Sequence, residues 1–167
     1  MGKGKEGHTG IKLELSSGGV VYKKDKAKVL WLVTKSSSNS KAFGSIWRLP
    51  KGRLDDIGSQ PGPLATGAKK ATEAEIKSAA LKEVEEEGGV RAKIVKKIGT
   101  ERYFFVFNNQ KYLKFVTFYL MVWQKDLPQG FSFETSEIAW LSFDEAYKKL
   151  SYAGEKSVLK KAKDLLI

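Results

Sequence analysis

Three glutamates in the middle of the chain have the spacing of a single helix face. Glu83, Glu86 and Glu87 stand at i, i+3 and i+4, positions that are neighbours on an α-helix. Apolar residues upstream continue the same face: Ile76, Ala79, Ala80 and Val84. The carboxylates therefore extend a buried stripe, whereas Glu85 is expected to point to water. Three half-buried like charges at a helix C-terminus, where the macrodipole disfavours anions, need compensation.

A divalent cation would supply this compensation. The stretch has no His or Cys beside the glutamates, and hard carboxylate oxygens suit Mg²⁺ or Mn²⁺ rather than Zn²⁺. The chain has no cysteine and a single histidine, His8. The lack of cysteine excludes a thiolate nucleophile, and a single histidine in the expected tail argues against a Ser-His-Asp triad.

Residues 82–90, K-E-V-E-E-E-G-G-V, resemble the end of the Nudix box, R-E-U-x-E-E-x-G-U, in which U is aliphatic. Lys82 replaces the arginine. Residues 47–52, W-R-L-P-K-G, look like the strand and glycine that open the box. The resemblance covers roughly residues 11–166 and implies the α+β fold of this family, a Nudix α/β/α sandwich with a mixed β-sheet.

The sequence departs from the family pattern in two places. The stretch between Gly52 and Lys82 is about 16 residues longer than in the usual box, which places an insert at about residues 53–71. Its glycines and prolines predict an irregular loop, which we expect to be mobile. The usual mid-box glutamate falls at Ala74, with Glu73 and Glu75 one residue away.

The resemblance also implies chemical roles for the residues that match the box. Metal ligands would be the Gly52 carbonyl and the carboxylates of Glu83, Glu86 and Glu87. Glu83 or Glu86 would be the catalytic base, with Glu134 or Glu137 from a later loop as further candidates. Lys82 would pair with a carboxylate of the box. The reaction is Mg²⁺-dependent hydrolysis of a phosphoric anhydride in a nucleoside diphosphate linked to another group.

Several features favour a polyphosphorylated nucleotide as the substrate. The chain most resembles the group that hydrolyses dinucleoside polyphosphates or diphosphoinositol polyphosphates. Basic residues are expected around the site as substrate-binding residues: Arg48, Lys51, Arg53, Arg102 and Lys114. Nucleoside triphosphates, ADP-ribose and RNA 5′-ends stay open as substrates. A non-catalytic module that binds nucleotides or RNA is the alternative of another class.

Composition bounds the organisation and the partners of the chain. Its 167 residues predict a single domain over residues 11–167 after a flexible basic tail at 1–10. The net charge of +11 favours anionic partners, nucleic acid included. No apolar run approaches the length of a membrane span, so we expect no membrane partner. The absence of cysteine fits a cytoplasmic location, and the oligomeric state stays open.

Periodicity predicts the elements that must position the glutamates. Thr72-x-x-Glu75 is a capping box that starts a helix at Glu73, and Gly88-Gly89 ends it. A bend or bulge is expected at residues 16–19, and the aromatic residues of 103–119 are expected to lie mostly in the core. The expected strands are 11–22, 29–33, 45–49, 91–99, 101–107, 112–123 and 136–141, followed by helices from Phe143 and over 154–166.

Overall fold

The computed structural model describes residues 10–37 and 46–166. Most of the expected tail therefore lies outside the described residues, as does residue 45, the first of an expected strand. The strands are β1 Lys12–Asp25, β2 Lys28–Ser36, β3 Trp47–Arg48, β4 Lys51–Arg53, β5 Asp56–Ile57, β6 Gln60–Pro61, β7 Val90–Phe107, β8 Gln110–Asp126 and β9 Thr135–Leu141. The helices are α1 Pro63–Thr66, α2 Glu73–Gly88, α3 Phe143–Lys149 and α4 Ala153–Leu165.

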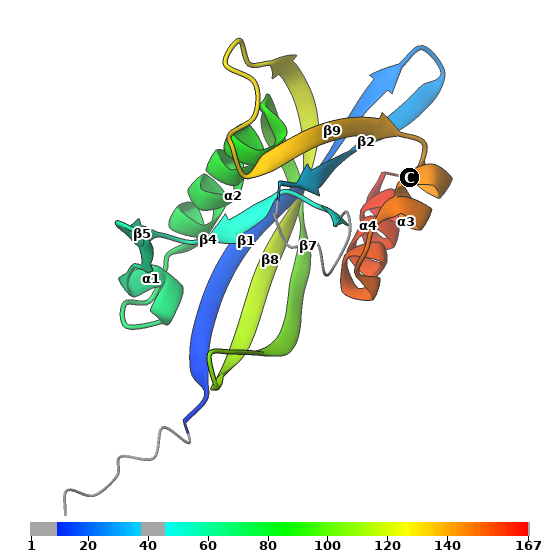
Figure 1. Ribbon diagram of the computed structural model, residues 1–167. Coiled ribbons are helices and arrows are strands. Elements are labelled where there is room, and N and C mark those ends of the chain that lie inside the picture. The colour runs from blue at the N-terminus through cyan, green and yellow to red at the C-terminus, as the bar shows by residue number, and fades with distance from the viewer. Residues whose placement is uncertain (1–9, 38–45, 167) are drawn as a thin grey trace, which may run out of the picture.

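The main sheet is mixed, as the sequence predicts. Its path runs β3-β2-β1-β8-β7, with β4 added to β1 and β9 added to β2. The central pair, β1 and β8, is parallel, and the other pairs are antiparallel. Helix α2 lies on one side of this sheet, and α3 and α4 lie on the other (Figure 1). The α+β class and the α/β/α sandwich are therefore confirmed.

Each helical layer has its own core. On the α2 side, Ala80 and Val84 pack with Val21, Leu32 and other strand residues. On the opposite side, the apolar faces of α3 and α4 pack on the sheet through Ala146, Leu150, Val158, Leu159 and Ala162. Burial of these apolar stripes fixes both layers on the sheet.

Helix α2 begins and ends where the sequence predicts. The Thr72 hydroxyl accepts a hydrogen bond from the Glu75 amide at 3.1 Å, and the Glu75 carboxylate accepts one from the Thr72 amide at 3.1 Å. This is the expected capping box. At the other end, Gly89 has φ +66°, and its amide donates to the Glu85 carbonyl. A left-handed residue of this kind stops a helix.

Two strand predictions are wrong in detail. The bend expected at residues 16–19 is absent, because this stretch is part of β1 and pairs with both β4 and β8. Its glycines allow close packing instead: a Cβ on Gly18 would overlap the Pro50 carbonyl. The two strands expected at 91–99 and 101–107 are one strand, β7, with irregularities in register before Gly99.

The prediction of an irregular loop at residues 53–71 is also wrong. This segment contains the β5–β6 hairpin and α1. The Asp55 carboxylate accepts hydrogen bonds from the amides of Leu64 and Ala65 at 3.0 and 2.8 Å. Arg53 binds Asp56 at 2.7 Å, and Ala65 is completely buried. A short aspartate side chain that caps α1 orders a segment that glycine and proline content alone assigns to a loop.

The aromatic residues of the β7–β8 hairpin are less buried than expected. Phe118 and Tyr119 lie in the core, but Phe104 and Phe107 are 64% and 62% exposed and Tyr103 is 38% exposed. The reason is topological. Strand β7 is at the edge of the sheet. The helices lie beside the part of the β7–β8 hairpin that is far from its turn (Figure 1).

Candidate active site

At the C-terminal end of α2, Glu83 lies near the carboxylates of Glu86, Glu87 and Glu134, and these four residues form the carboxylate cluster. Burial raises the pKa of Glu83 to about 8, with further contributions from the negative charges of Glu87, Glu86 and Glu134. A carboxyl group in such surroundings holds a proton near neutral pH unless a cation is present. Carboxyl groups of perturbed pKa in a cleft are typical of functional sites.

Glu87 is the most buried of the predicted ligands, with 3% exposure. Burial raises its pKa, and the opposing charges of Arg48 and Lys51 are the smaller effect. One carboxylate oxygen accepts a hydrogen bond from Arg48 Nη2 at 3.3 Å, and the other accepts from the Lys51 amide at 2.9 Å. Glu87 therefore fastens α2 to the segment that joins β3 to β4.

Glu86 is about half buried, as predicted, with 47% of its side chain exposed. Its carboxylate lies 3.7 Å from Lys82 Nζ, so the expected pair between Lys82 and a box carboxylate is present. Glu85 binds Arg91 at 3.4 Å and is 40% exposed. Glu85 and Glu86 thus differ in the side of the helix that they occupy, and hardly in exposure.

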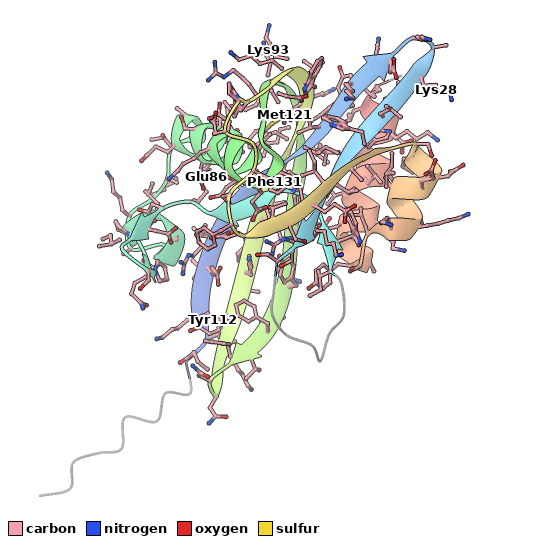
Figure 2. All side chains as sticks on the ribbon, turned by 45° about the horizontal axis from the view of Figure 1, so that its top comes forward. Lys28, Glu86, Lys93, Tyr112, Met121 and Phe131 are labelled. Atoms are coloured by element: carbon pink, nitrogen blue, oxygen red, sulfur yellow. The ribbon has the colours of Figure 1, made fainter. Side chains whose placement is uncertain are left out.

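The loop between β8 and β9 completes this end of the helix. The Ser132 amide donates to the Glu86 carbonyl at 2.7 Å, and the Leu127 amide donates to the Gly89 carbonyl at 2.8 Å. Figure 2 shows Phe131 of this loop beside the end of α2 that carries Glu86. The loop also carries Glu134, whose charge raises the pKa of both Glu83 and Glu87. Of the two later candidates, Glu134 therefore belongs to the cluster.

Glu137, the other later candidate, has a different place. Its carboxylate lies 3.9 Å from Lys35 Nζ and is 58% exposed. It stands on β9, opposite Lys35 of β2 in the sheet register.

The residues at the end of α2 fit a hard divalent cation. A Cβ on Gly52 would overlap the Glu83 carboxylate, so only glycine lets the β4 backbone lie so close to this group. Within residues 10–37 and 46–166, no three acidic or histidine side chains are already gathered as a ligand set. The Glu86 and Glu87 carboxylates are turned to basic partners instead, as like charges would be without a cation between them.

A cleft of about 710 Å³ opens on the α4 side of the sheet. Four of the five predicted substrate-binding residues line it: Arg48, Lys51, Arg102 and Lys114. Aromatic residues form much of the remaining wall, in particular Tyr103, Phe105 and Tyr152. Lys51 Nζ lies 5.9 Å from the centre of the Tyr152 ring, and Lys114 Nζ lies 5.9 Å from that of Tyr103. Cations and π-faces therefore alternate along the cleft.

Two of these lysines are held by carboxylates. Lys51 Nζ binds Glu155 at 2.7 Å, and Glu155, which is 6% exposed, also accepts a hydrogen bond from the Leu49 amide. Lys114 lies 3.5 Å from Glu14. Burial lowers the pKa of Lys114, although Glu14 opposes this effect. Sequence reasoning missed Glu155, because an acidic residue in the first turn of a helix is common and gives no signal of burial.

Arg53, the fifth predicted residue, does not line the cleft. Its guanidinium binds Asp56 and donates to the Ser59 carbonyl at 3.3 Å. In this structure Arg53 is bound by residues of its own segment, and a substrate contact at Arg53 stays a prediction.

The NUDIX domain family model matches residues 12–162. This chain belongs to the Nudix family. The match spans the whole carboxylate cluster and the cleft, and the chain therefore has the domain of a Nudix hydrolase. Helix α2 and Gly52, which resemble the Nudix box, lie within the matched residues.

Comparisons with individual proteins agree with this assignment. The MutT4 protein of Mycobacterium tuberculosis (strain CDC 1551 / Oshkosh) is 28% identical over 121 residues, which are 72% of this chain and 42% of that protein. The chain thus spans about two fifths of the length of this curated relative.

Two solved structures have the same fold. A binary complex of the Caenorhabditis elegans Ap4A hydrolase is 21% identical, with a TM-score of 0.59 over 92% of this chain and 97% of that chain. A NUDIX hydrolase from Nitrosomonas europaea is 18% identical, with a TM-score of 0.63 over 92% and 90%. Among the described residues, no helix is long and apolar enough to cross a membrane.

Proposed function

We propose that this chain is a Mg²⁺- or Mn²⁺-dependent pyrophosphohydrolase whose substrate is a dinucleoside polyphosphate. The observation that carries the proposal is the continuity of two features. Arg48 and Lys51 bind Glu87 of the carboxylate cluster, and the same two residues line the aromatic, basic cleft. An anhydride held by the cleft would therefore reach the cluster.

The cleft supports a polyphosphate with an attached base. Arg48 Nε is buried and has no hydrogen-bond partner among the described residues, and a phosphate oxygen would satisfy it. Arg102 adds a second guanidinium, which suits phosphate oxygens. Tyr103 and Tyr152 offer ring faces on which a nucleobase can stack. The C. elegans protein of the same fold is an Ap4A hydrolase, which agrees with this choice of substrate.

The proposed chemistry assigns a role to each acidic residue. Glu83, Glu86 and Glu87, with the Gly52 carbonyl, would hold the divalent ion, which would offset negative charge on the phosphates. Glu83 is our choice for the base that accepts the proton of the attacking water, with Glu86 as the second candidate. Glu134 belongs to the same cluster and can assist either role. Arg48 would orient the phosphates while Lys51 keeps its contact with Glu155.

Steady-state kinetics on a panel of nucleotides test this proposal. The panel contains diadenosine tetraphosphate, ADP-ribose, a nucleoside triphosphate and a 5′-triphosphorylated RNA, each with Mg²⁺, with Mn²⁺ and with a chelator. We expect a higher kcat/KM for diadenosine tetraphosphate than for ADP-ribose, because the longer polyphosphate carries more charge into the basic cleft. The advantage should shrink as salt rises from 0.05 to 0.5 M, since exposed charges are screened over about 10 Å at 0.1 M.

The panel also separates the alternatives. A preference for ADP-ribose that salt leaves unchanged contradicts the proposed substrate but not the hydrolase. Tight nucleotide or RNA binding without turnover in Mg²⁺ or Mn²⁺ contradicts the enzyme and supports a binding module. A cytoplasmic location, suggested by the lack of cysteine, stays a prediction.

A further inference from the structure

A second hollow lies away from the candidate active site. Its volume is about 280 Å³. The residues that line it are Leu13, Leu15, Ser16, Leu54, Gly67, Lys69, Lys70, Ala71, Ile76, Phe115 and Thr117. None of them lines the cleft. Residues 115 and 117 of β8 belong to the cavity, whereas residues 114 and 118 belong to the cleft. Because side chains alternate along a strand, the two sites lie on opposite faces of the sheet.

The 53–71 segment builds one wall of this cavity. Leu54 and the stretch from Gly67 to Ala71 form that wall, and Ile76 of α2 and strands β1 and β8 form the rest. The wall is anchored on the strands: the Leu54 amide donates to the Leu15 carbonyl at 3.0 Å. A Cβ on Gly67, whose φ is +79°, would overlap the Leu13 side chain. The cavity is therefore a consequence of how this segment is folded onto β1.

The floor of the cavity is mainly apolar. Leu13 and Leu15 of β1 and Phe115 of β8 line it from one face of the sheet. Ser16 also borders the cavity, but its side chain lies on the opposite face of β1, because side chains alternate along a strand. A floor of this kind suits the apolar part of a ligand.

The mouth of the cavity is basic. Lys69 and Lys70 are the only charged residues that line it. Within the described part of the chain, neither lysine forms an ion pair. The remaining walls are mostly aliphatic or aromatic. Two unpaired cations at the opening of an apolar hollow favour a ligand with a single anionic end.

Apolar surface continues from the cavity along the same face of the sheet. Leu13 stands beside Leu113, which stands beside Phe104 in the next strand. Leu13 and Val106 are 37% and 65% exposed. Phe104 is 64% exposed and also borders the cleft. Monomeric proteins seldom leave such contiguous apolar surface without a use. A ligand longer than the cavity would therefore meet further apolar side chains.

We propose that this cavity binds a small amphipathic anion, with an apolar body and one carboxylate or phosphate head. The body packs between Leu13, Leu54 and Phe115, and the head lies at Lys69 and Lys70. The volume suits this class, because a cavity of about 150 Å³ already accommodates a benzene ring. The site is independent of the proposed hydrolysis and needs no catalytic residue.

Binding of simple probes tests the proposal. The anionic probes are hexanoate and hexyl phosphate, and the controls are 1-hexanol and hexylammonium, which keep the same body. Two-dimensional NMR of the full chain follows the amides of residues 13–16 and 67–71 during each titration. We expect both anions to shift these amides and to bind at least about tenfold more tightly than 1-hexanol. A difference between the two anions identifies the preferred head.

Matched variants locate the binding. Lys69→Gln with Lys70→Gln removes the basic mouth, and the control Lys93→Gln with Lys96→Gln removes two exposed lysines of β7. Ala71→Trp fills the cavity from its own wall. We expect the first double variant to lower the affinity for both anions about tenfold, Ala71→Trp to abolish binding, and the control to behave as wild type. Dispersed NMR spectra verify that each variant is folded.

Several results would overturn the proposal. Equal affinity for 1-hexanol and hexanoate would show that the head group is not recognised. Shifts confined to cleft residues such as Tyr103 and Tyr152 would place the anions in the candidate active site. The absence of shifts up to millimolar probe would remove the site. The apolar face would instead be a contact between two copies of the chain if two results occurred together. The NMR shifts would disappear when the protein is diluted, and the wild type would form dimers that Phe104→Ser does not form.

Discussion

The two ends of α2 follow opposite rules. At the N-terminus, Thr72 and Glu75 form a reciprocal cap, and Glu73 adds a negative charge where the helix dipole favours it. At the C-terminus, no basic residue lies in the last turn, and three glutamates accumulate negative charge where the dipole opposes it. Burial and mutual repulsion then raise the pKa of Glu83 to about 8.

The residues of the N-terminal end stabilise the helix, whereas we propose that the glutamates of the C-terminal end bind a ligand. The Glu75 carboxylate of the capping box has its partner within the helix end itself, and Glu73 lies 3.8 Å from Lys97 of β7. At the other end, Glu87 contacts Arg48 of β3 and the Lys51 amide of β4. Glu86 forms an ion pair with Lys82. An arrangement that weakens the free protein at one place is typical of a binding site. Removing charges at the two ends should therefore have opposite effects on stability.

The largest effect is expected from Glu86→Gln. It should lower kcat at least about 100-fold, because a ligand of the catalytic ion is lost, with little change in Tm. Glu85→Gln is the matched control, since Glu85 is also about half exposed and also has one basic partner. Its kcat should stay within about twofold of wild type, because its side chain lies on the other side of the helix.

Initial rates at saturating diadenosine tetraphosphate and Mg²⁺ decide between the two residues. Similar losses in both variants would show that charge on this helix end, and not a particular face, supports the reaction. No loss in Glu86→Gln would remove Glu86 from the ligand set and leave Glu83, Glu87 and Glu134.

A smaller effect is expected from pH on the chain without divalent ions. The folded-state pKa of Glu83, about 8, lies above its ordinary value of 4.5, mainly through burial. The folded chain therefore binds this proton more readily than the unfolded chain, so its contribution to stability is full below about pH 4.5 and is lost as pH rises to 8. Thermal unfolding with a chelator should show a falling Tm over this range.

Glu83→Gln sharpens this prediction. At pH 8 in chelator, its Tm should exceed that of wild type by about 5 °C, whereas at pH 4.5 the two should agree. Mg²⁺ should raise the Tm of wild type at pH 8 more than that of the variant. If wild type and variant have parallel Tm profiles over this range, burial of Glu83 does not govern the pH response.

The smallest effect belongs to the capped end. Thr72→Ala removes the hydroxyl that accepts from the Glu75 amide and should lower the free energy of unfolding by about 1 kcal/mol. The kcat of the folded variant should be unchanged, because the cap lies at the far end of α2 from the glutamates. Urea unfolding and kinetics on the same samples measure both. A loss of kcat without a loss of stability would contradict the division between the two ends.

Local patterns carried much of the fold to its correct outcome. Thr72, Glu75 and Gly89 define α2 because capping depends on residues that are close in sequence. The apolar run from Val29 to Val33 was likewise predictable as part of a strand, β2, because it is a local pattern of neighbouring residues. Contacts between distant residues produced the errors. The uninterrupted course of β1 past Gly18 depends on β4 and β8, and the fold of the 53–71 segment depends on the hydrogen bonds of Asp55 to α1.

The candidate site divides in the same way. The spacing of Glu83, Glu86 and Glu87 is a property of one helix, and their assembly at one end could be predicted. Which basic residues line the cleft could be predicted only in part: four of the five do, but Arg53 and Arg102 have the same charge and different neighbours. Glu155 carried no signal, since its role arises only when α4 packs against the segment from Leu49 to Lys51.

The buried Glu155 contact has a consequence for the order in which the molecule is completed. Lys51 and Glu155 are 104 positions apart, and a chain grows on the ribosome from its N-terminus. The Nudix box leaves the ribosome long before its partner in α4 does. A nascent chain that has folded its sheet and α2 thus still has an unfinished cleft, with Lys51 unpaired. We expect the cleft to gain its final shape only after the Nudix box has been synthesised, when α4 docks against the segment from Leu49 to Lys51.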